Sequence, residues 1–354
     1  MLLKLNRYLT RLCVFLIMAA LIAGMVGCDG DGDGYTPSQD LEIHDWYDLD
    51  AVRDNLEGHH ILMNDLNSTT AGYTALASPT ANQGQGWESI GRGYWASGPP
   101  SIRLVGEVFK GSFDGQGYEI RDLCINCSSW GGSGLFGCVG QGGIIKNISV
   151  INATVTVPEN VDWVVRLNEG TVGSLDVAPI GAVGILVGFN MGSVSDSHAS
   201  GTVSGVFNVG GLVGQNTGTV NNSYSTGNVT GTNGIGGLVG TNGALIFSGT
   251  VSNSYSTGNV TGHEYVGGLV GKNEYSSAGV DFSGTVTNSF WDTETSGQST
   301  SDGGTGKTTA EMQDIVTFSG AGWNIVAVAP GSTNTSYIWN IVNTVTYPFL
   351  SWET

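Results

Sequence analysis

The sequence predicts an all-β fold: a parallel β-helix (β-solenoid) with a short amino-terminal capping helix and an aromatic carboxyl-terminal cap. Two repeated phrases predict it. The first phrase, Gly-x-Leu-Val-Gly, occupies residues 184–188, 210–214, 236–240 and 267–271. The second phrase, SHASGTVSG and then SYSTGNVTG twice, occupies residues 197–205, 223–231 and 254–262. Both advance in steps of 26 or 31 residues, a period typical of solenoids, in which each repeat stacks on its neighbour.

Between these phrases, residues alternate with the period of two that a half-buried strand shows. Stacked coils would align equivalent residues in columns about 4.8 Å apart. The expected columns are Val194, Val220, Val251 and Val286; Asp196, Asn222, Asn253 and Asn288; and His198, Tyr224, Tyr255 and Phe290. We expect Val220, Asn222 and Tyr224 to share one strand face, and the Asn column to pair its amides along the stack. The repeated glycines mark corners, where φ is positive or no side chain fits.

The two ends of the stack each have a predicted cap, which would prevent edge-to-edge association of strands. At the amino end, residues 45–56 place Trp46, Leu49, Val52 and Leu56 on one face of a helix, followed by a first strand over residues 60–65.

At the carboxyl end, Thr308 to Glu311 match a capping box that opens a short helix. Aromatic residues follow it: Trp323, Trp339, Tyr347, Phe349 and Trp352. We expect this segment to close the last coil; an aromatic sugar-binding platform is the alternative.

The repeats resemble the GLUG-motif proteins, bacterial and archaeal surface or secreted proteins. The resemblance rests on the two phrases above and on SFWDTETSGQSTSDGGTGKTTAEMQ at residues 289–313. It covers residues 181–313 clearly, and FKGSFDGQGYEIRDLCI (109–125) with SGLFG (133–137) resembles earlier coils. The resemblance implies an adhesin-like repeat scaffold and brings no catalytic motif. Residues 155–178 lack the repeat spacing, so we expect a loop inserted between coils.

The amino end has the layout of a bacterial lipoprotein signal. Basic residues precede an apolar run over residues 13–26, which is too short for a comfortable transmembrane helix. The run ends at Met25-Val26-Gly27-Cys28, which resembles a lipobox. We expect lipid attachment at Cys28, because acyl chains on that sulfur would hold the protein on a membrane. An ordinary signal peptide with an incidental cysteine is the alternative.

These observations predict four segments: a signal peptide (1–27), an acidic flexible tether (28–42), the β-helix (43–308, clearest over 181–290) and a carboxyl-terminal cap (309–354). The tether contains DGDGDG, but Asp40 stands where an EF-hand loop needs Glu, so we expect no calcium site there. The protein would be exported and lipid-anchored in the cell envelope, facing the exterior; which membrane holds it stays open.

Charge and composition fit an exported scaffold. The chain has 57 glycines in 354 residues and a formal net charge of −18; without residues 1–27, which carry three basic residues and no acidic one, the charge is −21. So acidic a chain is not expected to bind nucleic acid, which requires a basic surface. The expected partners are the membrane, through the anchor, and surface glycans or other surface proteins.

Three further cysteines, Cys124, Cys127 and Cys138, suit either a structural disulfide or buried thiols outside the cytoplasm. For the disulfide, Cys127 or Cys124 would pair with Cys138. No metal or cofactor site is expected, since His263-Glu264 lacks the second histidine of a zinc motif and the adjacent His59 and His60 point to opposite faces.

Two functional classes remain open. The first is a lipid-anchored surface β-helix that acts in adhesion or as a structural scaffold without catalysis. The second is a carbohydrate-binding or carbohydrate-active protein, since parallel β-helices also carry polysaccharide lyases and hydrolases. The first is favoured because the outward positions of the repeats are Ser, Thr and Asn, which offer little acid–base chemistry. The carboxylates to examine are Asp114, Asp281, Asp292 and Glu294.

Overall fold

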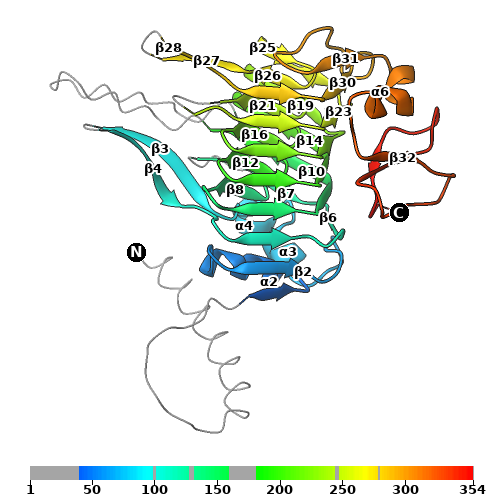
Figure 1. The fold of residues 1–354 in the computed structure, drawn as a ribbon. Coiled ribbons are helices and arrows are strands. Elements are labelled where there is room, and N and C mark those ends of the chain that lie inside the picture. Colours follow the sequence, from blue (N-terminus) through cyan, green and yellow to red (C-terminus); the bar gives the residue numbers. More distant parts are fainter. Residues whose placement is uncertain are drawn as a thin grey trace, which may run out of the picture. The chain divides into compact units, whose positions relative to one another are not determined.

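The fold is a parallel β-helix, as predicted (Figure 1). The computed structural model describes residues 40–98, 101–126, 131–158, 181–243, 247–277 and 280–353. The first sheet contains eight parallel strands, one from each turn: β1 (Leu41–Ile43), β2 (His59–Leu62), β5 (Ser112–Asp114), β9 (Ile144–Lys146), β13 (Ser193–Ser195), β17 (Thr219–Asn221), β22 (Thr250–Ser252) and β29 (Thr285–Thr287).

Three further sheets complete the turns. The second sheet contains β6 (Glu119–Arg121), β7 (Cys124–Asn126), β10 (Ser149–Thr156), β14 (His198–Ser204), β18 (Tyr224–Ser225), β19 (Asn228–Thr230), β23 (Tyr255–Ser256), β24 (Val260–Thr261), β30 (Phe290–Asp292) and β31 (Thr305–Lys307). The third contains β11 (Val183–Gly184), β15 (Phe207–Gly210), β20 (Asn233–Gly236) and β25 (Glu264–Gly267). The fourth contains β8 (Phe136–Val139), β12 (Val187–Asn190), β16 (Val213–Asn216), β21 (Val239–Asn242) and β26 (Val270–Lys272).

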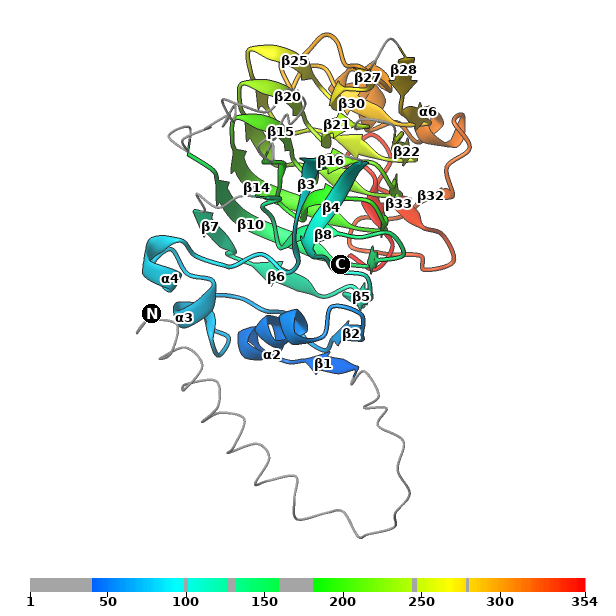
Figure 2. The same cartoon turned by 90° about the vertical axis from the view of Figure 1, so that its left-hand side faces the viewer.

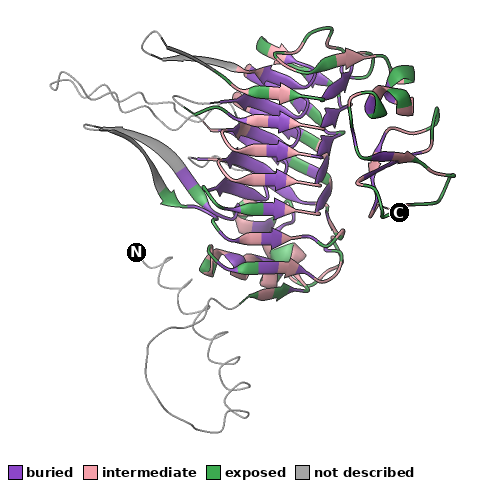
Figure 3. Ribbon diagram, in the orientation of Figure 1, coloured by how far each residue is buried: buried purple, intermediate pink, exposed green. Residues whose placement is uncertain are grey.

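The interior of the coils is a continuous apolar core (Figure 3). In the first sheet, the central residue of each strand from β5 to β29 points inward, and the register aligns Phe113, Ile145, Val194, Val220, Val251 and Val286. The predicted valine column is therefore confirmed. The register of the second sheet likewise aligns His198, Tyr224, Tyr255 and Phe290, which confirms the predicted aromatic column.

The prediction that these two columns share a face is wrong. Val220 belongs to the main core, whereas Tyr224 packs in a second apolar cluster outside the coil. Asn222, between β17 and β18, has φ of 47°, and its equivalents Asp196, Asn253 and Asn288 have φ of 47–49°. Asn and Asp tolerate this left-handed conformation better than other non-glycine residues. The predicted Asn column is thus a row of bends, and each bend reverses the alternation of side chains.

A different asparagine ladder runs through the fourth sheet. Asn190 donates to Asn216, Asn216 to Asn242, and Asn242 to Asn273, each through Nδ2 to Oδ1 at 2.8 Å. The sequence signal for this ladder, which was not among the predictions, is the Asn three residues after the Leu-Val pair of each block.

Glycine in the Gly-x-Leu-Val-Gly blocks lets neighbouring turns of the chain approach closely. A Cβ on Gly211 would lie 2.2 Å from the carbonyl oxygen of Gly237 and from Ser225 Oγ. Two roles were predicted for the repeated glycines: positive φ, or a place without room for a side chain. Gly211 has the second role, because its φ is not positive, whereas the Asn and Asp residues at the bends have positive φ.

The amino end contains the predicted helix, α2 (Trp46–Ala51), continued by the short helix η1 (Val52–Asp54). Asp45 caps α2 by accepting from the backbone amides of Tyr47 and Asp48, and Trp46, Leu49 and Val52 are buried. The tether was expected to reach residue 42, but Leu41–Ile43 forms β1 and pairs with β2. Two further short helices, α3 (Tyr73–Leu76) and α4 (Ala81–Gly84), follow.

The carboxyl end of the coil stack is covered by residues 291–307. Trp291, only 5% exposed, lies in the main core, and its Nε1 donates to the Gln298 carbonyl at 3.0 Å. Ser301 Oγ accepts from the amides of Leu269 and Val270.

The aromatic segment therefore does not close the last coil, contrary to the prediction. It contains α5 (Thr309–Met312), α6 (Ile315–Ser319) and a small sheet of β32 (Ile325–Ala327), β33 (Trp339–Ile341) and β34 (Phe349–Leu350). It runs back along the outside of the second sheet (Figure 1), which buries the aromatic column. The predicted capping box is confirmed, because Thr308 and Glu311 exchange the two expected hydrogen bonds.

Two antiparallel hairpins extend from the same side of the β-helix (Figure 2). One consists of β3 (Arg92–Gly98) and β4 (Ser101–Glu107), the other of β27 (Glu274–Ser277) and β28 (Val280–Ser283). The loop predicted over residues 155–178 begins later than expected, since Val155 and Thr156 still pair in β10. Most of that predicted loop, including Trp163 and Arg166, lies outside the described residues.

Candidate functional site

The second apolar cluster joins the outer face of the second sheet to the carboxyl-terminal segment. Its buried members are Tyr224, Tyr255, Phe290, Met312, Phe318, Trp323, Ile325, Trp339, Ile341 and Leu350. His198 stacks on Tyr224 and Tyr224 on Tyr255, with ring centroids 4.0 and 4.8 Å apart. The spacing follows from the strand register, so the fold itself forms this aromatic column.

Polar side chains hold the segment at defined points along the column. Tyr255 donates its hydroxyl to the Pro348 carbonyl at 2.5 Å, and Trp323 Nε1 donates to the Asn288 carbonyl at 2.7 Å. Tyr347 donates its hydroxyl to Asp292 Oδ2 at 2.7 Å. These bonds satisfy groups that burial would otherwise leave unpaired, and they fix the register of the segment.

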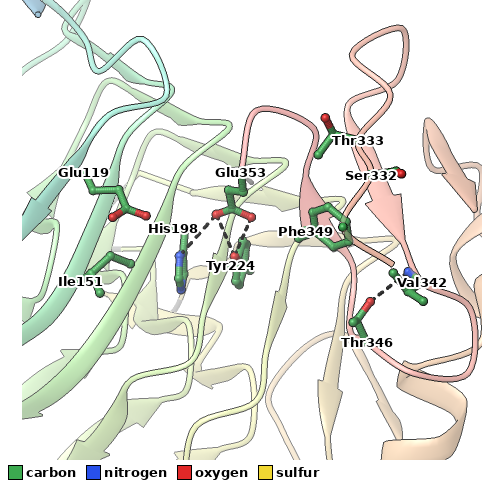
Figure 4. Close-up of a pocket in the computed structure, with 11 residues that line it drawn as sticks. Glu119, Ile151, His198, Tyr224, Ser332, Thr333, Val342, Thr346, Phe349 and Glu353 are labelled. Atoms are coloured by element: carbon green, nitrogen blue, oxygen red, sulfur yellow. Dashed lines mark hydrogen bonds and ion pairs between the residues drawn. The ribbon is translucent and has the colours of Figure 1, made fainter. Parts of the chain in front are cut away.

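A cavity of about 450 Å³ lies where the segment ends (Figure 4). Its lining residues come from distant parts of the chain: Glu119, Ile151, His198, Tyr224, Gly331, Ser332, Thr333, Val342, Thr346, Phe349 and Glu353. Glu353 is the central group. Tyr224 donates its hydroxyl to both carboxylate oxygens at 2.8 Å, and the amide of Leu350 donates to Oε2 at 2.8 Å.

Burial and the nearby carboxylate favour the neutral form of the tyrosine. Burial raises the pKa of Tyr224 well above 10, and the negative charge of Glu353 raises it further. Tyr224 therefore remains a hydrogen-bond donor to Glu353 throughout the physiological pH range.

A serine beside the cavity, Ser149, meets a histidine and a carboxylate of its lining, but not in the geometry of a catalytic relay. Ser149 Oγ and Glu353 Oε1 both face the same histidine nitrogen, His198 Nδ1, at 3.5 and 3.4 Å. A relay needs the nucleophile on one ring nitrogen and the acid on the other. Ser149 is also only 1% exposed, which leaves its hydroxyl inaccessible to a polymer substrate.

The carboxylates singled out in the sequence have structural partners. Asp292 is fully buried and accepts from Thr309 Oγ1, Tyr347 and two backbone amides, while Glu294 accepts from the amide of Thr309. Both bind the carboxyl-terminal segment to the last coil.

The other two carboxylates lie elsewhere. Asp114 pairs with Lys146 at 3.1 Å; burial opposes its ionisation, but hydrogen bonds from Asn147, the Gln116 amide and Lys146 outweigh this and lower its pKa. Asp281 lies in β28.

The cysteine predictions are tested only in part. Cys124 and Cys138 are both buried, and they do not form a disulfide with each other. Burial raises the pKa of the Cys138 thiol to about 12, which makes it a poor nucleophile. Cys127 and the expected lipid attachment site Cys28 both lie outside the described residues, so pairing of Cys127 with Cys138 and lipidation remain predictions.

Metal-ligating residues are scattered over the described part of the chain, which contains no group of three or more His, Cys, Asp or Glu side chains placed to hold a metal ion. His59 and His60 point to opposite sides of β2, as predicted: His60 is buried and His59 is exposed. Among the residues described here, no helix has the length and apolar character needed to span a bilayer.

His198 and Tyr224 are recognisable in the sequence as members of a column, whereas the cavity beside them is not. Glu353, which binds Tyr224, lies 129 residues further along the chain. No local pattern marks this glutamate, so only the path of the carboxyl-terminal segment brings it to the site.

Comparison with known proteins supports the repeat assignment. The family described as the GLUG motif matches residues 205–230, one full turn of the β-helix. Halomucin of Haloquadratum walsbyi is 34% identical over 50% of this chain, and a "Putative Gly-rich membrane protein" of Evansella cellulosilytica is 30% identical over 47%. The chain spans only 2% and 18%, respectively, of the lengths of these relatives.

A solved structure shares the fold. It is the crystal structure of "a putative immunoglobulin A1 protease from Bacteroides ovatus", with a TM-score of 0.55 and 16% sequence identity. The match covers 90% of this chain and 94% of that one, and at such low identity it supports the fold alone. The chain is a parallel β-helix in which one turn, residues 205–230, matches the GLUG motif.

Proposed function

We propose that this protein is exported, anchored to a membrane through lipid on Cys28, and acts as a non-catalytic β-helical scaffold in adhesion or surface interactions. The observation that carries the scaffold function is the placement of the insertions. The β3–β4 hairpin begins two residues after Ile90, which bridges to Phe136 in the fourth sheet, and β27–β28 directly follows the Asn273 end of the Asn ladder. In solenoids, insertions that gather on one face often form the binding face.

In the four turns from β13 to β29, the outward columns of the first sheet support a role without catalysis. The positions that flank the inward valines of these turns are Ser193, Ser195, Thr219, Asn221, Thr250, Ser252, Thr285 and Thr287. None of these side chains titrates near neutral pH, so this surface offers hydrogen bonding rather than acid–base chemistry.

The adhesion test uses a hairpin variant. Replacing residues 94–105 by Gly-Gly is expected to abolish binding of the purified mature protein to its target cells while leaving the urea midpoint of unfolding within error. The matched control replaces the outward pair Thr219 and Asn221 by Ala. Equal binding by the hairpin variant would show that the hairpin is not the contact surface.

The anchor test uses metabolic labelling with palmitate. We expect the wild-type protein to be labelled and membrane-bound, and Cys28→Ser to be unlabelled and released, because the thiol is the acylation site. Cys127→Ser is the control and is expected to retain its label. Membrane retention of the Cys28→Ser protein would contradict a lipid anchor.

Two enzymatic activities are tested. The first is degradation of polysaccharides, the alternative function. The second is cleavage of immunoglobulin A1, the activity for which the structural relative is named. A glycan array, a polysaccharide-degradation screen and incubation with immunoglobulin A1 are performed on the mature chain. Binding without turnover is expected; turnover of any of these substrates would overturn the proposal.

A further inference from the structure

The cavity beside Glu353 has an excess of negative charge at its wall. Glu119 of β6 and Glu353 of the carboxyl-terminal segment both line it (Figure 4). None of the described residues that line it is Lys or Arg. Glu119 has Arg121 as an ion-pair partner, whereas the hydroxyls of Tyr224 and Ser149 and the amide of Leu350 bind Glu353 as neutral donors.

Glu353 is poorly hydrated, since its side chain is only 16% exposed. In the described part of the chain, the basic side chain placed against Glu353 is His198, whose Nδ1 lies 3.4 Å from Oε1. A partly desolvated carboxylate gains more from a charge-assisted hydrogen bond than from a neutral one. The ligand that best complements this wall therefore carries a positive charge and N–H donors.

The remaining walls of the cavity would suit a ligand with neutral hydroxyl groups and apolar C–H groups. Thr346 accepts from the amide of Val342 at 3.0 Å, so its own O–H is available to donate. Ser332 and Thr333 add exposed hydroxyls at the rim, and Phe349 and Ile151 add apolar surface. A volume of about 450 Å³ lies within the range of roughly 300–1,000 Å³ that is usual for small-molecule sites.

We propose that this cavity binds a hydroxylated primary amine of the amino-sugar class. The ammonium group lies against Glu353 and Glu119, and the sugar hydroxyls bond to the threonine and serine hydroxyls. The site is separate from the hairpins assigned to adhesion, so either assignment can fail without the other.

The test is calorimetric titration of the full chain at pH 7 with glucosamine, glucose and lysine methylamide. Glucosamine is expected to bind, and glucose to bind at least about tenfold more weakly, because it lacks the ammonium group. Lysine methylamide is expected to bind more weakly than glucosamine, because it lacks the ring hydroxyls. Glucosamine affinity is also expected to fall as salt screens the carboxylates.

Two variants locate the site. Glu119→Gln and Glu353→Gln are each expected to weaken glucosamine binding by at least about fivefold. Glu119 does not hold the carboxyl-terminal segment, so its variant remains informative even if Glu353→Gln loosens that segment. Glu57→Gln, at an exposed position in another turn, is the matched control and keeps the parent affinity.

Four results would overturn the proposal. They are no glucosamine binding, equal affinity for glucose and glucosamine, equal affinity for lysine methylamide, and a loss in Glu57→Gln as large as that in Glu119→Gln. Circular dichroism and the urea midpoint confirm that each variant is folded.

Discussion

At the scale of single residues, the buried Asn ladder contributes specificity to the stack. Asn216 is fully buried; it accepts from Asn190 and donates to Asn242, and its Nδ2 also lies 3.2 Å from the Thr250 carbonyl. A one-residue slip between coils would leave these amides without partners in a low-dielectric interior. The ladder therefore fixes the register that the interchangeable valines alone would not.

Replacing Asn216 by Ala is expected to destabilise the protein by about 2–4 kcal/mol, because it leaves the Asn190 donor and the Asn242 acceptor unpaired. Thr219→Ala, which alters an outward side chain, is expected to change the free energy of unfolding by about 0.5 kcal/mol or less. Urea unfolding followed by circular dichroism measures both. Equal effects would show that the ladder has no special role.

The buried tyrosines make stability fall in alkaline solution. Burial and the charge of Glu353 raise the pKa of Tyr224 and Tyr255 well above 10, and burial together with Asp292 raises that of Tyr347 to about 12. Unfolded tyrosine ionises near pH 10. Above that pH the native state retains protons that the unfolded state has released, so stability decreases as pH rises.

We therefore expect the free energy of unfolding to fall between about pH 9 and pH 11, and to fall less in Tyr224→Phe. At pH 7, Tyr224→Phe is expected to cost about 1–3 kcal/mol through the lost bonds to Glu353. The control is Tyr337→Phe, at an exposed position, which keeps the parent slope. An unchanged slope in Tyr224→Phe would contradict the explanation.

At the scale of elements, the bend between the first and second sheets decides what each strand face contacts. Asn253 has φ of 47° and lies between β22 and β23, so Val251 points into the coil and Tyr255 points outward. The helix α2 and the capping box of α5 were predictable because each depends on residues only a few positions apart. The bends were not, because a period of two continues through Asn253 without interruption in the sequence.

Asn253→Val is expected to destabilise the protein by about 1–2 kcal/mol more than Asn253→Gly, since a β-branched residue is strained at positive φ and glycine is not. The two variants differ mainly in backbone strain, because Asn253 is half-buried and both variants lose the same side-chain amide. Equal unfolding midpoints would show that backbone strain does not limit the bend.

At the scale of the whole molecule, the carboxyl-terminal segment converts an exposed aromatic column into a second core. Trp339 is fully buried and Trp323 is 5% exposed, so these tryptophans do not form the sugar-binding platform considered as an alternative. The ends of the coil stack are covered instead by α2 at one end and by Trp291 at the other.

Deleting residues 309–354 is expected to expose Tyr224, Tyr255 and Phe290 and to leave Asp292 without two of its hydrogen-bond donors. Exposed apolar patches of this kind promote association. We expect increased binding of a hydrophobic dye, a lower urea midpoint and a larger apparent size than that of the full chain in size-exclusion chromatography. A shortened chain that matches the full chain in all three would show that the segment is not part of the core.

The sequence by itself determined the repeat, the β-helix, the valine and aromatic columns, the helix α2 and the capping box of α5, because each depends on residues that recur at a fixed step or lie a few positions apart. Only the tertiary structure decided that Val220 and Tyr224 point to opposite sides, that the aromatic segment covers a flank, and that Glu353 meets Tyr224 beside a cavity. These features depend on φ at a few bends and on contacts across 129 residues. Such contacts leave no periodic trace, because they are made once and not in every coil.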